Sequence, residues 1–369
     1  MEYLFVTGWS MGNHRGGLSQ YVLDHESGEL SLISKTAETT DYGTVFFNRE
    51  KKVIYALNED RELGASSVDT YKIDLDTGDK ELIGRADTLM PFPSYLGVAP
   101  AGKYACVSDH SYGAASLKLE KDENGVPHAV KSVTDAAVIL FPVLEDGSLG
   151  EAVDAVVHTG SGVLPRQNMP HPHCVVFSPL ADFFAVCDKG NDQIYIYRIK
   201  DSKLDLVNNW HVTPGSMPRY ALFHPEKPFF YYNNEGDEFV CAYTYDKDGN
   251  FEKTGEYSVV AQGHGGKFMQ QGLCMDNDGR HIYAAEGITG QIAVLEIDQE
   301  SGALKPVQYI GHDYDGLRGI CLAPEGDFLI ATYMKSGKVV VFKVGPDGRL
   351  TDTGCESDCD LAADIEFAY

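Results

Sequence analysis

The sequence lacks any apolar run long enough to cross a bilayer, and it lacks the basic start of a secretory signal. The chain begins with Met1 and Glu2, so that an acid stands where a signal peptide carries Lys or Arg. We therefore expect no membrane segment and a cytoplasmic location.

Positive charge is also scarce. The 369 residues include 30 Lys and Arg against 55 Asp and Glu, which gives a formal net charge of −25. Such a charge repels phosphate backbones and anionic membrane surfaces, so we expect no nucleic-acid or membrane partner. A small anionic or sugar-derived substrate is compatible with it only where Arg, Lys or His side chains cluster locally.

Helical periodicity is nearly absent, whereas short β-branched and aromatic runs bounded by Gly, Asp and Pro recur throughout. Similar turn segments punctuate these runs at residues 24–30, 74–78, 145–149, 201–204, 246–250, 298–304 and 346–350. Glycines in neighbouring turns lie 46, 50 or 53 residues apart, a period typical of β-propeller blades. The pattern predicts an all-β, seven-bladed β-propeller of four-stranded antiparallel blades.

The repeats extend over the chain, so we expect a single domain over residues 1–369. An apolar run that ends in a turn recurs along the chain, and we call each copy an apolar frame. Only six frames are complete, and the sequence opens with a strand at 3–7 and closes with another at 364–369. We expect these two strands to share the seventh blade, which closes the ring and leaves no exposed sheet edge. One longer interval indicates a charged insertion at about 118–137.

Cysteine spacing gives no metal or disulfide framework. Six cysteines lie in apolar, strand-like runs, where a reduced thiol behaves as a small buried hydrophobe: Cys106, Cys174, Cys187, Cys241, Cys274 and Cys321. Cys355 and Cys359 lie in an acidic segment without a second pair of ligands, so we interpret them as incidental thiols rather than a metal site or a disulfide.

The apolar frames can be superimposed on the turn that closes each one. Six positions before that turn stand Gly43, Ser94, His173, Arg219, Gln271 and Arg318. Nine positions after it, at the end of the next strand, stand Asn58, Asp109, Asp188, Asn234, Glu286 and Tyr333. Because two strands joined by a tight turn run antiparallel, both sets should lie at one end of the blade. They predict a polar funnel around the axis, to which Glu59 and Glu235 add carboxylates.

Two histidines stand out in this funnel. His171 and His173 lie two residues apart among prolines, so both imidazoles should face one side of an extended segment. They either cap strand ends or take part in catalysis with Arg219 and Arg318, and both interpretations stay open. Arg166 either reaches the funnel from a loop or is solvated. No further ligand stands at metal-binding spacing, so no metal site is expected.

Seven segments carry a resemblance to a known family: 55–59 (YALNE), 145–150 (EDGSLG), 158–162 (HTGSG), 165–167 (PRQ), 170–179 (PHPHCVVFSP), 218–219 (PR) and 234–235 (NE). Together they resemble the lactonase family of seven-bladed propellers, which includes bacterial 6-phosphogluconolactonases and is related to carboxymuconate-cyclising propellers. The resemblance spans nearly the whole chain and implies functional residues at His173, Arg219, Glu235 and Arg318. The sequence departs from the family pattern at three places: Asp109 with His110, Tyr220, and Glu286 with Gly287.

The resemblance implies a metal-independent, cofactor-free lactonase of the pentose phosphate pathway, with 6-phosphogluconolactone as its substrate. In that reaction His173 or Glu235 would be the base and Arg219 would stabilise the oxyanion. Arg318 and His171 would bind the anionic group of the substrate. Gln271, Arg166 and Ser94 would also bind the substrate.

Two other functions stay open. One is a cyclase or isomerase of a muconate-type carboxylate, with Arg219 and Arg318 holding carboxylates. The other is a propeller that binds partners without catalysis, although convergent His, Arg and Glu side chains argue against it. We expect a monomer or a homodimer.

Overall fold

The computed structural model describes residues 2–59, 66–110, 116–132, 135–261 and 266–369. Within these residues the chain is built from β-strands, and the only helical segment is the short 3-10 helix η1 (Pro165–Gln167). No helix in this part of the chain has the length and apolar character needed to span a membrane. The all-β prediction is confirmed.

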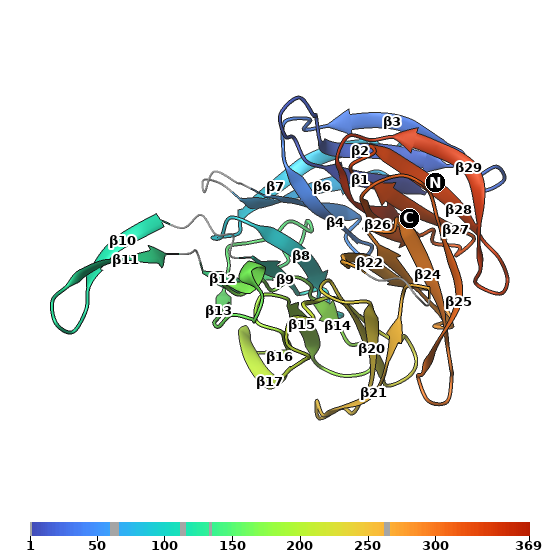
Figure 1. The fold of residues 1–369 in the computed structure, drawn as a ribbon. Helices are drawn as coiled ribbons and strands as arrows, with labels where there is room; N and C mark the ends of the chain where they lie inside the picture. Colours follow the sequence, from blue (N-terminus) through green and yellow to red (C-terminus); the bar gives the residue numbers. More distant parts are fainter. Residues whose placement is uncertain (1, 60–65, 111–115, 133–134, 262–265) are drawn as a thin grey trace.

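Seven four-stranded antiparallel sheets are arranged around a central axis (Figure 1). In the lists that follow, the innermost strand of each sheet comes first. The first complete sheet consists of β4 (Tyr42–Asn48), β5 (Val53–Asn58), β6 (Ser67–Ile73) and β7 (Lys80–Asp87). The second consists of β8 (Pro93–Val98), β9 (Tyr104–Asp109), β12 (Ala136–Pro142) and β13 (Asp154–His158), and the third of β14 (Val176–Phe177), β15 (Phe184–Asp188), β16 (Gln193–Lys200) and β17 (Lys203–His211). The next three are β18 (Pro218–Phe223), β19 (Phe229–Asn234), β20 (Phe239–Tyr245) and β21 (Phe251–Ser258); β22 (Gln270–Met275), β23 (His281–Glu286), β24 (Gln291–Ile297) and β25 (Leu304–Gly311); and β26 (Leu317–Leu322), β27 (Phe328–Tyr333), β28 (Lys338–Val344) and β29 (Leu350–Asp358).

The seventh sheet joins the two ends of the chain, as predicted. Its strands, innermost first, are β30 (Ala362–Ala368), β1 (Tyr3–Gly8), β2 (Gly17–Leu23) and β3 (Leu30–Thr36). β1 and β30 pair antiparallel, with Tyr3 opposite Ala368, and the two termini lie close together (Figure 1). The ring is therefore closed by hydrogen bonds between its first and last strands.

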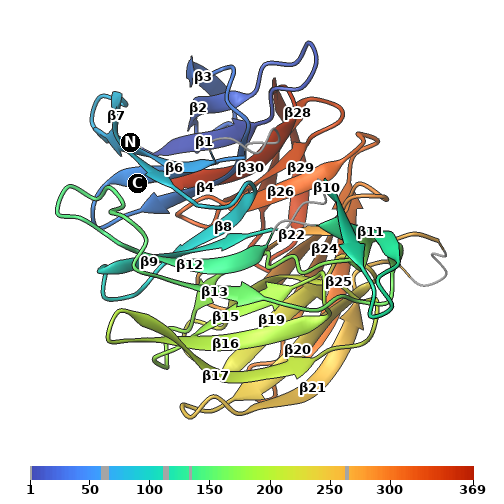
Figure 2. The same ribbon diagram turned by 90° about the vertical axis from the view of Figure 1, so that its left-hand side faces the viewer.

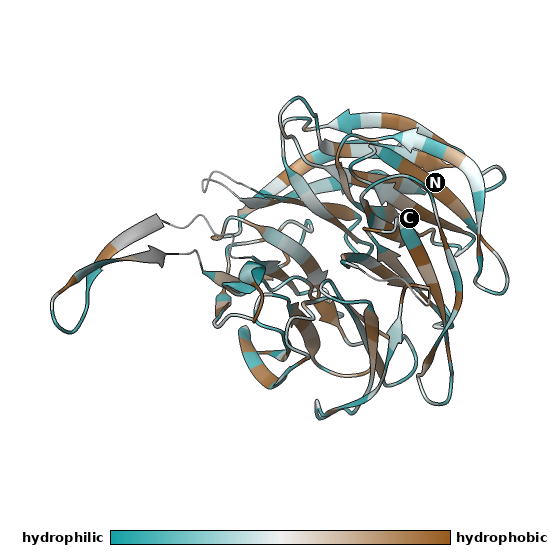
Figure 3. Cartoon of the chain, in the orientation of Figure 1, coloured by the Kyte–Doolittle hydropathy of each residue, from teal (hydrophilic) through white to brown (hydrophobic). Residues whose placement is uncertain are grey.

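Burial follows the position of a strand in its sheet. All six residues of β27 are buried, because neighbouring blades cover both faces of a second strand. In the outermost strand β29 exposed residues recur, because its outer side faces solvent. Apolar residues are concentrated in the strands and polar residues in the connecting loops (Figure 3). This arrangement explains why inner strands read as continuous apolar runs without a clear alternation.

The turns found in the sequence close the hairpins between outer strands. In the turn after β24, the Asp298 carboxylate accepts hydrogen bonds from the backbone N–H groups of Glu300 and Ser301, at 3.1 and 2.8 Å. Gly302 follows with φ +73°, a left-handed conformation that glycine adopts at little cost. An Asp followed four residues later by Gly is thus a local signal for this hairpin.

A separate two-stranded sheet interrupts the blade of β8, β9, β12 and β13. It consists of β10 (Ser116–Lys121) and β11 (Pro127–Ser132), and it projects from the ring on the side that Figure 2 turns toward the viewer. It lies where the charged insertion at about 118–137 is expected, although residues 133 and 134 fall outside the described part. Asp109 still pairs with Ala137, so the blade continues around the hairpin.

All eight cysteines are free thiols. Cys355 lies in β29, and Cys359 is buried with its sulfur 3.8 Å from the Ser19 hydroxyl. The two sulfurs form no disulfide, and neither residue belongs to the one close group of metal-ligating side chains found among the described residues.

Candidate active site

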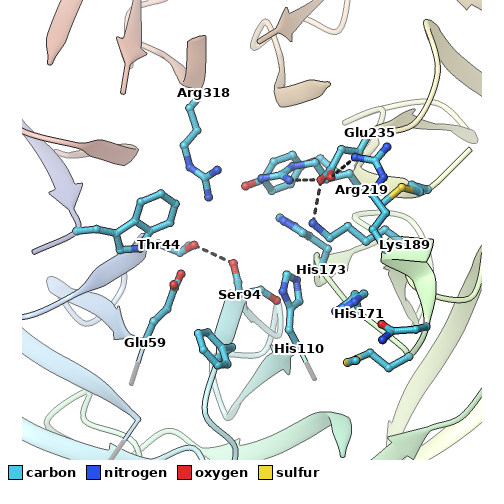
Figure 4. A pocket seen from close by; sticks show the side chains of 17 residues that line it. Thr44, Glu59, Ser94, His110, His171, His173, Lys189, Arg219, Glu235 and Arg318 are labelled. Carbon is cyan, nitrogen blue, oxygen red and sulfur yellow. Dashed lines mark hydrogen bonds and ion pairs between the residues drawn. The ribbon is translucent and has the colours of Figure 1, made fainter. Parts of the chain in front are cut away.

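A cavity of about 420 Å³ opens at one end of the propeller axis (Figure 4). Seven residues that the sequence singled out as site residues line it: Ser94, Arg166, His171, His173, Arg219, Glu235 and Arg318. The remaining lining residues are Trp9, Thr44, Glu59, Phe92, His110, Asn168, Met169, Lys189, Met217 and Tyr220. Residues from distant parts of the chain therefore meet in one polar funnel.

The first register set reaches the funnel from the start of the innermost strands. Arg219 and Arg318 are the second residues of β18 and β26, which places both at the same level of the axis. Gln271 occupies the equivalent position in β22 but does not line the cavity; its Oε1 accepts a hydrogen bond from Nη1 of Arg318 at 3.3 Å. At Gly43 a Cβ would lie 1.7 Å from Oε1 of Glu59, so glycine leaves room for that carboxylate.

The second register set does not line the cavity, and here the sequence prediction is wrong by one residue. The residues that follow Asn58, Asp109, Asp188 and Asn234 line it instead: Glu59, His110, Lys189 and Glu235. Successive side chains of a strand point to opposite sides, so a shift of one position exchanges inward and outward residues. The same register, advanced by one, would have identified His110 and Lys189.

Members of the second register set instead hold the loops around the funnel in place. Glu286 is buried and accepts backbone hydrogen bonds from Met269, Ile288 and Thr289. Its carboxylate therefore adds no charge to the cavity lining, although it departs from the family pattern at this position.

The His-Pro-His segment is held by buried groups on two blades. Oδ1 of Asp188 accepts a hydrogen bond from the His171 backbone N–H at 2.7 Å, and the Cys187 carbonyl accepts one from the His173 N–H at 2.8 Å. The Ser94 hydroxyl lies 2.9 Å from the carbonyl oxygen of Pro172. Ser94 thus supports the segment from the neighbouring blade as well as lining the cavity.

Three imidazoles form a cluster at the floor of the funnel. The His110 ring centroid lies 5.3 Å from that of His171 and 5.0 Å from that of His173. Burial, reinforced by Arg219 and Lys189, holds the pKa of His173 well below its usual range. Burial also lowers the pKa of His171 to about 4 and that of His110 well below normal. All three rings are therefore neutral at neutral pH and are able to accept protons.

Glu235 lies within an ion cluster on one side of the funnel (Figure 4). Its Oε2 accepts hydrogen bonds from Nζ of Lys189 at 2.8 Å and from Nη1 of Arg219, and Nη1 of Arg166 lies 3.6 Å from Oε1. Burial opposes ionisation of Glu235, but Lys189 and Arg219 outweigh it and hold its pKa below the usual range. The carboxylate is therefore charged and engaged by cations.

Arg318 stands on the other side of the cavity, together with Glu59 (Figure 4). Its guanidinium carbon lies 4.4 Å above the centre of the Trp9 ring, and its Nε donates to the Ala363 carbonyl at 3.1 Å. These contacts fix the guanidinium at the cavity wall. Comparison of the repeats could not identify Trp9 as a cavity residue, because it lies in the loop between β1 and β2 and not in a repeated frame.

The close group of metal-ligating side chains found among the described residues lies away from the funnel. Among the described residues, the group of three potential ligands with donor atoms within 4.8 Å of one another is His25, Glu325 and Asp327. None of these residues lines the cavity. The neutral imidazoles and the cations of the funnel are instead suited to moving protons and binding anions.

Several known proteins are similar to this chain over nearly its whole length. The sequence model of the family described as "Lactonase, 7-bladed beta-propeller" matches residues 3–367. A 6-phosphogluconolactonase of Bacillus subtilis is 27% identical over 352 residues, covering 95% of this chain and 94% of its own. A 6-phosphogluconolactonase of Formosa agariphila is 24% identical over 351 residues, covering 92% of each chain.

A solved structure shares the fold over the full length. The periplasmic gluconolactonase of Pseudomonas aeruginosa superimposes with a TM-score of 0.86 and 22% identity, covering 100% of this chain and 99% of its own. At this identity the likeness concerns the arrangement of the blades.

Proposed function

Because the chain belongs to the lactonase family of seven-bladed β-propellers, we propose that it hydrolyses a sugar lactone, 6-phosphogluconolactone, in the funnel. Two relatives that cover nearly the whole chain bear the name of this activity. The observation that carries the proposal is the neutral His173 imidazole beside the Arg219 guanidinium at the floor of a cavity that admits a small molecule.

His173 is the base in this proposal. Its ring is buried, and its Nδ1 has no hydrogen-bond partner among the described residues. Glu235, the other candidate, accepts hydrogen bonds from Lys189 and Arg219 at its Oε2. A group that takes a proton from water must be unprotonated and not already engaged by other donors, and His173 meets these conditions better than Glu235.

The reaction proceeds in two steps. Water adds to the lactone carbonyl carbon while His173 takes a proton from that water, and the negative charge on the carbonyl oxygen is stabilised by Arg219. The bond between this carbon and the ring oxygen then breaks, and the proton on His173 passes to the departing oxygen. The product is a hydroxy acid that ionises in water. Arg318 and His171 contact the substrate from the cavity walls.

The proposed chemistry uses side chains alone, so dialysis against EDTA is expected to leave turnover unchanged. We also propose a cytoplasmic location, which the eight free thiols support because disulfides are scarce in reducing compartments. Cell fractionation tests it, and recovery of the protein with periplasmic markers would contradict it.

The central experiment measures acid release from 6-phosphogluconolactone after subtraction of spontaneous opening. We expect His173→Asn to lower kcat by about 100- to 10,000-fold, the usual contribution of a general base, with little change in KM. The matched control is His211→Asn at an exposed histidine of β17, which should retain full activity.

Two results would contradict the proposal. One is unchanged turnover in His173→Asn. The other is a wild-type protein that opens no sugar lactone but changes the absorbance of a muconate-type lactone, which would favour the cyclase alternative.

A further inference from the structure

One side of the funnel carries more positive charge than its carboxylate neutralises. Arg166, Lys189 and Arg219 all contact Glu235. Three cations around one carboxylate leave two positive charges in excess. A phosphomonoester carries about −1.5 to −2 charges at neutral pH, which matches this excess, whereas a single carboxylate carries about −1.

The three cations differ in their exposure to solvent. The exposed fraction of the side chain is 4% for Arg219, 14% for Lys189 and 43% for Arg166. Arg219 is therefore the most enclosed of the three, and Arg166 is the most open to solvent. In a phosphorylated sugar lactone the phosphate is at the opposite end of the molecule from the carbonyl. With the carbonyl at the floor, the phosphate would come beside Lys189 and Arg166.

Buried hydrogen bonds connect the segments that carry these cations. Nε2 of Gln167, the residue after Arg166, donates to the Lys189 carbonyl at 2.9 Å and to Oδ1 of Asp192 at 2.7 Å. Gln167 and Asp192 are both buried. At Gly190 a Cβ would lie 2.1 Å from the carbonyl oxygen of Met169, so the turn after Lys189 requires glycine. The segments that carry the two cations are thus fixed relative to each other before a ligand binds.

The charge state of Lys189 is consistent with a site for an anion. Burial lowers its pKa to about 8, although the neighbouring Glu235 acts in the opposite direction. A bound dianion would favour the charged ammonium and offset the cost of its burial.

Resting on the proposed lactonase function, we propose that Arg166 and Lys189 anchor the phosphate group of the substrate, with Glu235 as the shared counter-ion that orients them. They thereby select phosphorylated over unphosphorylated sugar lactones. Glu235 is a positioning residue in this arrangement and takes no proton from water.

The test compares two lactones that differ in the phosphate, 6-phosphogluconolactone and gluconolactone. In Lys189→Met and in Arg166→Leu we expect KM for the phosphorylated lactone to rise by about 10- to 100-fold, the loss of one charged hydrogen bond. The KM for the phosphorylated lactone should rise at least about 10-fold more than the KM for gluconolactone. Lys189→Arg should restore most of the preference because it keeps the charge.

The matched control is Lys335→Met. Lys335 is also a lysine paired with a carboxylate, that of Asp315, but its side chain is 59% exposed and it does not line the cavity. This variant should keep the preference for the phosphorylated lactone. Equal losses on both lactones in Lys189→Met, or no change on either, would overturn the proposal.

A binding measurement separates this proposal from the lactonase function. Calorimetry with 6-phosphogluconate and gluconate needs no turnover. If the wild type opens neither lactone but binds 6-phosphogluconate at least about 10-fold more tightly than gluconate, and Lys189→Met removes the difference, the phosphate subsite stands and the lactonase function fails. If the wild type binds both acids equally, the subsite is wrong whatever the activity.

Discussion

At the scale of single residues, the buried imidazole of His173 determines how activity should depend on pH. A base acts in its neutral form, so activity is lost as the pH falls through the pKa of the folded enzyme. Burial, Arg219 and Lys189 hold that pKa well below the ordinary value of about 6.5. As the pH is lowered, we therefore expect kcat/KM to remain constant through pH about 6.5 and to fall only at a pH well below that value. Rates measured from about pH 4 to about pH 9 test this.

The alkaline limb belongs to a different residue. Lys189, with a pKa of about 8, loses its charge as the pH rises past that value, so KM for the phosphorylated lactone should increase there. In Lys189→Arg the alkaline limb should disappear while the acid limb remains. An acid limb centred near pH 6.5 would contradict the assignment of His173.

At the scale of elements, the β15 end residue Asp188 holds the segment that carries the histidines. Its Oδ1 accepts hydrogen bonds from the N–H groups of His171 and Gly190, and its Oδ2 lies 2.7 Å from Nδ1 of His158. Asp188→Ala leaves these buried donors without a partner, at a cost of about 1–3 kcal/mol for each. We expect a lower Tm and, because His173 is displaced, a fall in kcat of about 10- to 100-fold.

The control for Asp188→Ala is Asp246→Ala. Asp246 also accepts two backbone hydrogen bonds, from Asp248 and Asn250, but in an exposed turn that does not line the funnel. This variant should lower Tm slightly and leave kcat unchanged. If Asp188→Ala lowers Tm but retains full kcat, Asp188 supports the blade without positioning the histidines.

The same elements explain which parts of the molecule can be predicted from sequence. The Asp and Gly turns are local, so their spacing predicts the blades, and the strands at the two ends of the chain predict the closure of the ring. Four residues of the first register set line the cavity, Ser94, His173, Arg219 and Arg318, because a single frame fixes their phase, whereas Gln271 does not line it. The register misses His110 and Lys189 because it takes the next strand one residue out of phase, where Asp109 and Asp188 are equally polar.

The ion cluster has a different origin. Arg166 lies on η1, Lys189 follows β15 and Glu235 follows β19, so their contacts depend on how blades pack together. Nothing local in the sequence indicates that Glu235 is shared by three cations. Comparison of equivalent positions in the sequence indicates Arg219 but not Lys189, and the protonation of each member of the cluster depends on its neighbours in space.

At the scale of the whole molecule, the charge of the funnel is opposite to that of the chain. Among the described residues, four cationic side chains and two carboxylates line the cavity, whereas the chain as a whole carries a formal charge of −25. The acidic surface repels large polyanions, and the local excess of positive charge accepts a small anion that has entered the funnel. The two features together favour a phosphorylated metabolite over a phosphate backbone.

The closure of the ring gives a prediction for the entire fold. β30 is the innermost strand of its blade, and its Ile365 and Phe367 are 3% and 2% exposed. Burial of each such side chain contributes about 1.5–3 kcal/mol, and a folded domain is stable by only about 5–15 kcal/mol. Deleting residues 360–369 should therefore give insoluble protein or lower Tm by more than about 10 °C in calorimetry.

The control for this truncation is a circular permutant that is opened between the exposed residues Lys247 and Asp248 and has its original termini joined by a short Gly-Ser linker. It keeps the pairing of β1 with β30 within a continuous chain and should retain a cooperative transition near the wild-type Tm. A truncated protein that unfolds cooperatively at the wild-type Tm would show that the remaining blades hold the ring without β30. Because the innermost strands on either side, β26 and β4, both contact β30, its loss should also displace Arg318 and abolish lactone turnover in any soluble fraction.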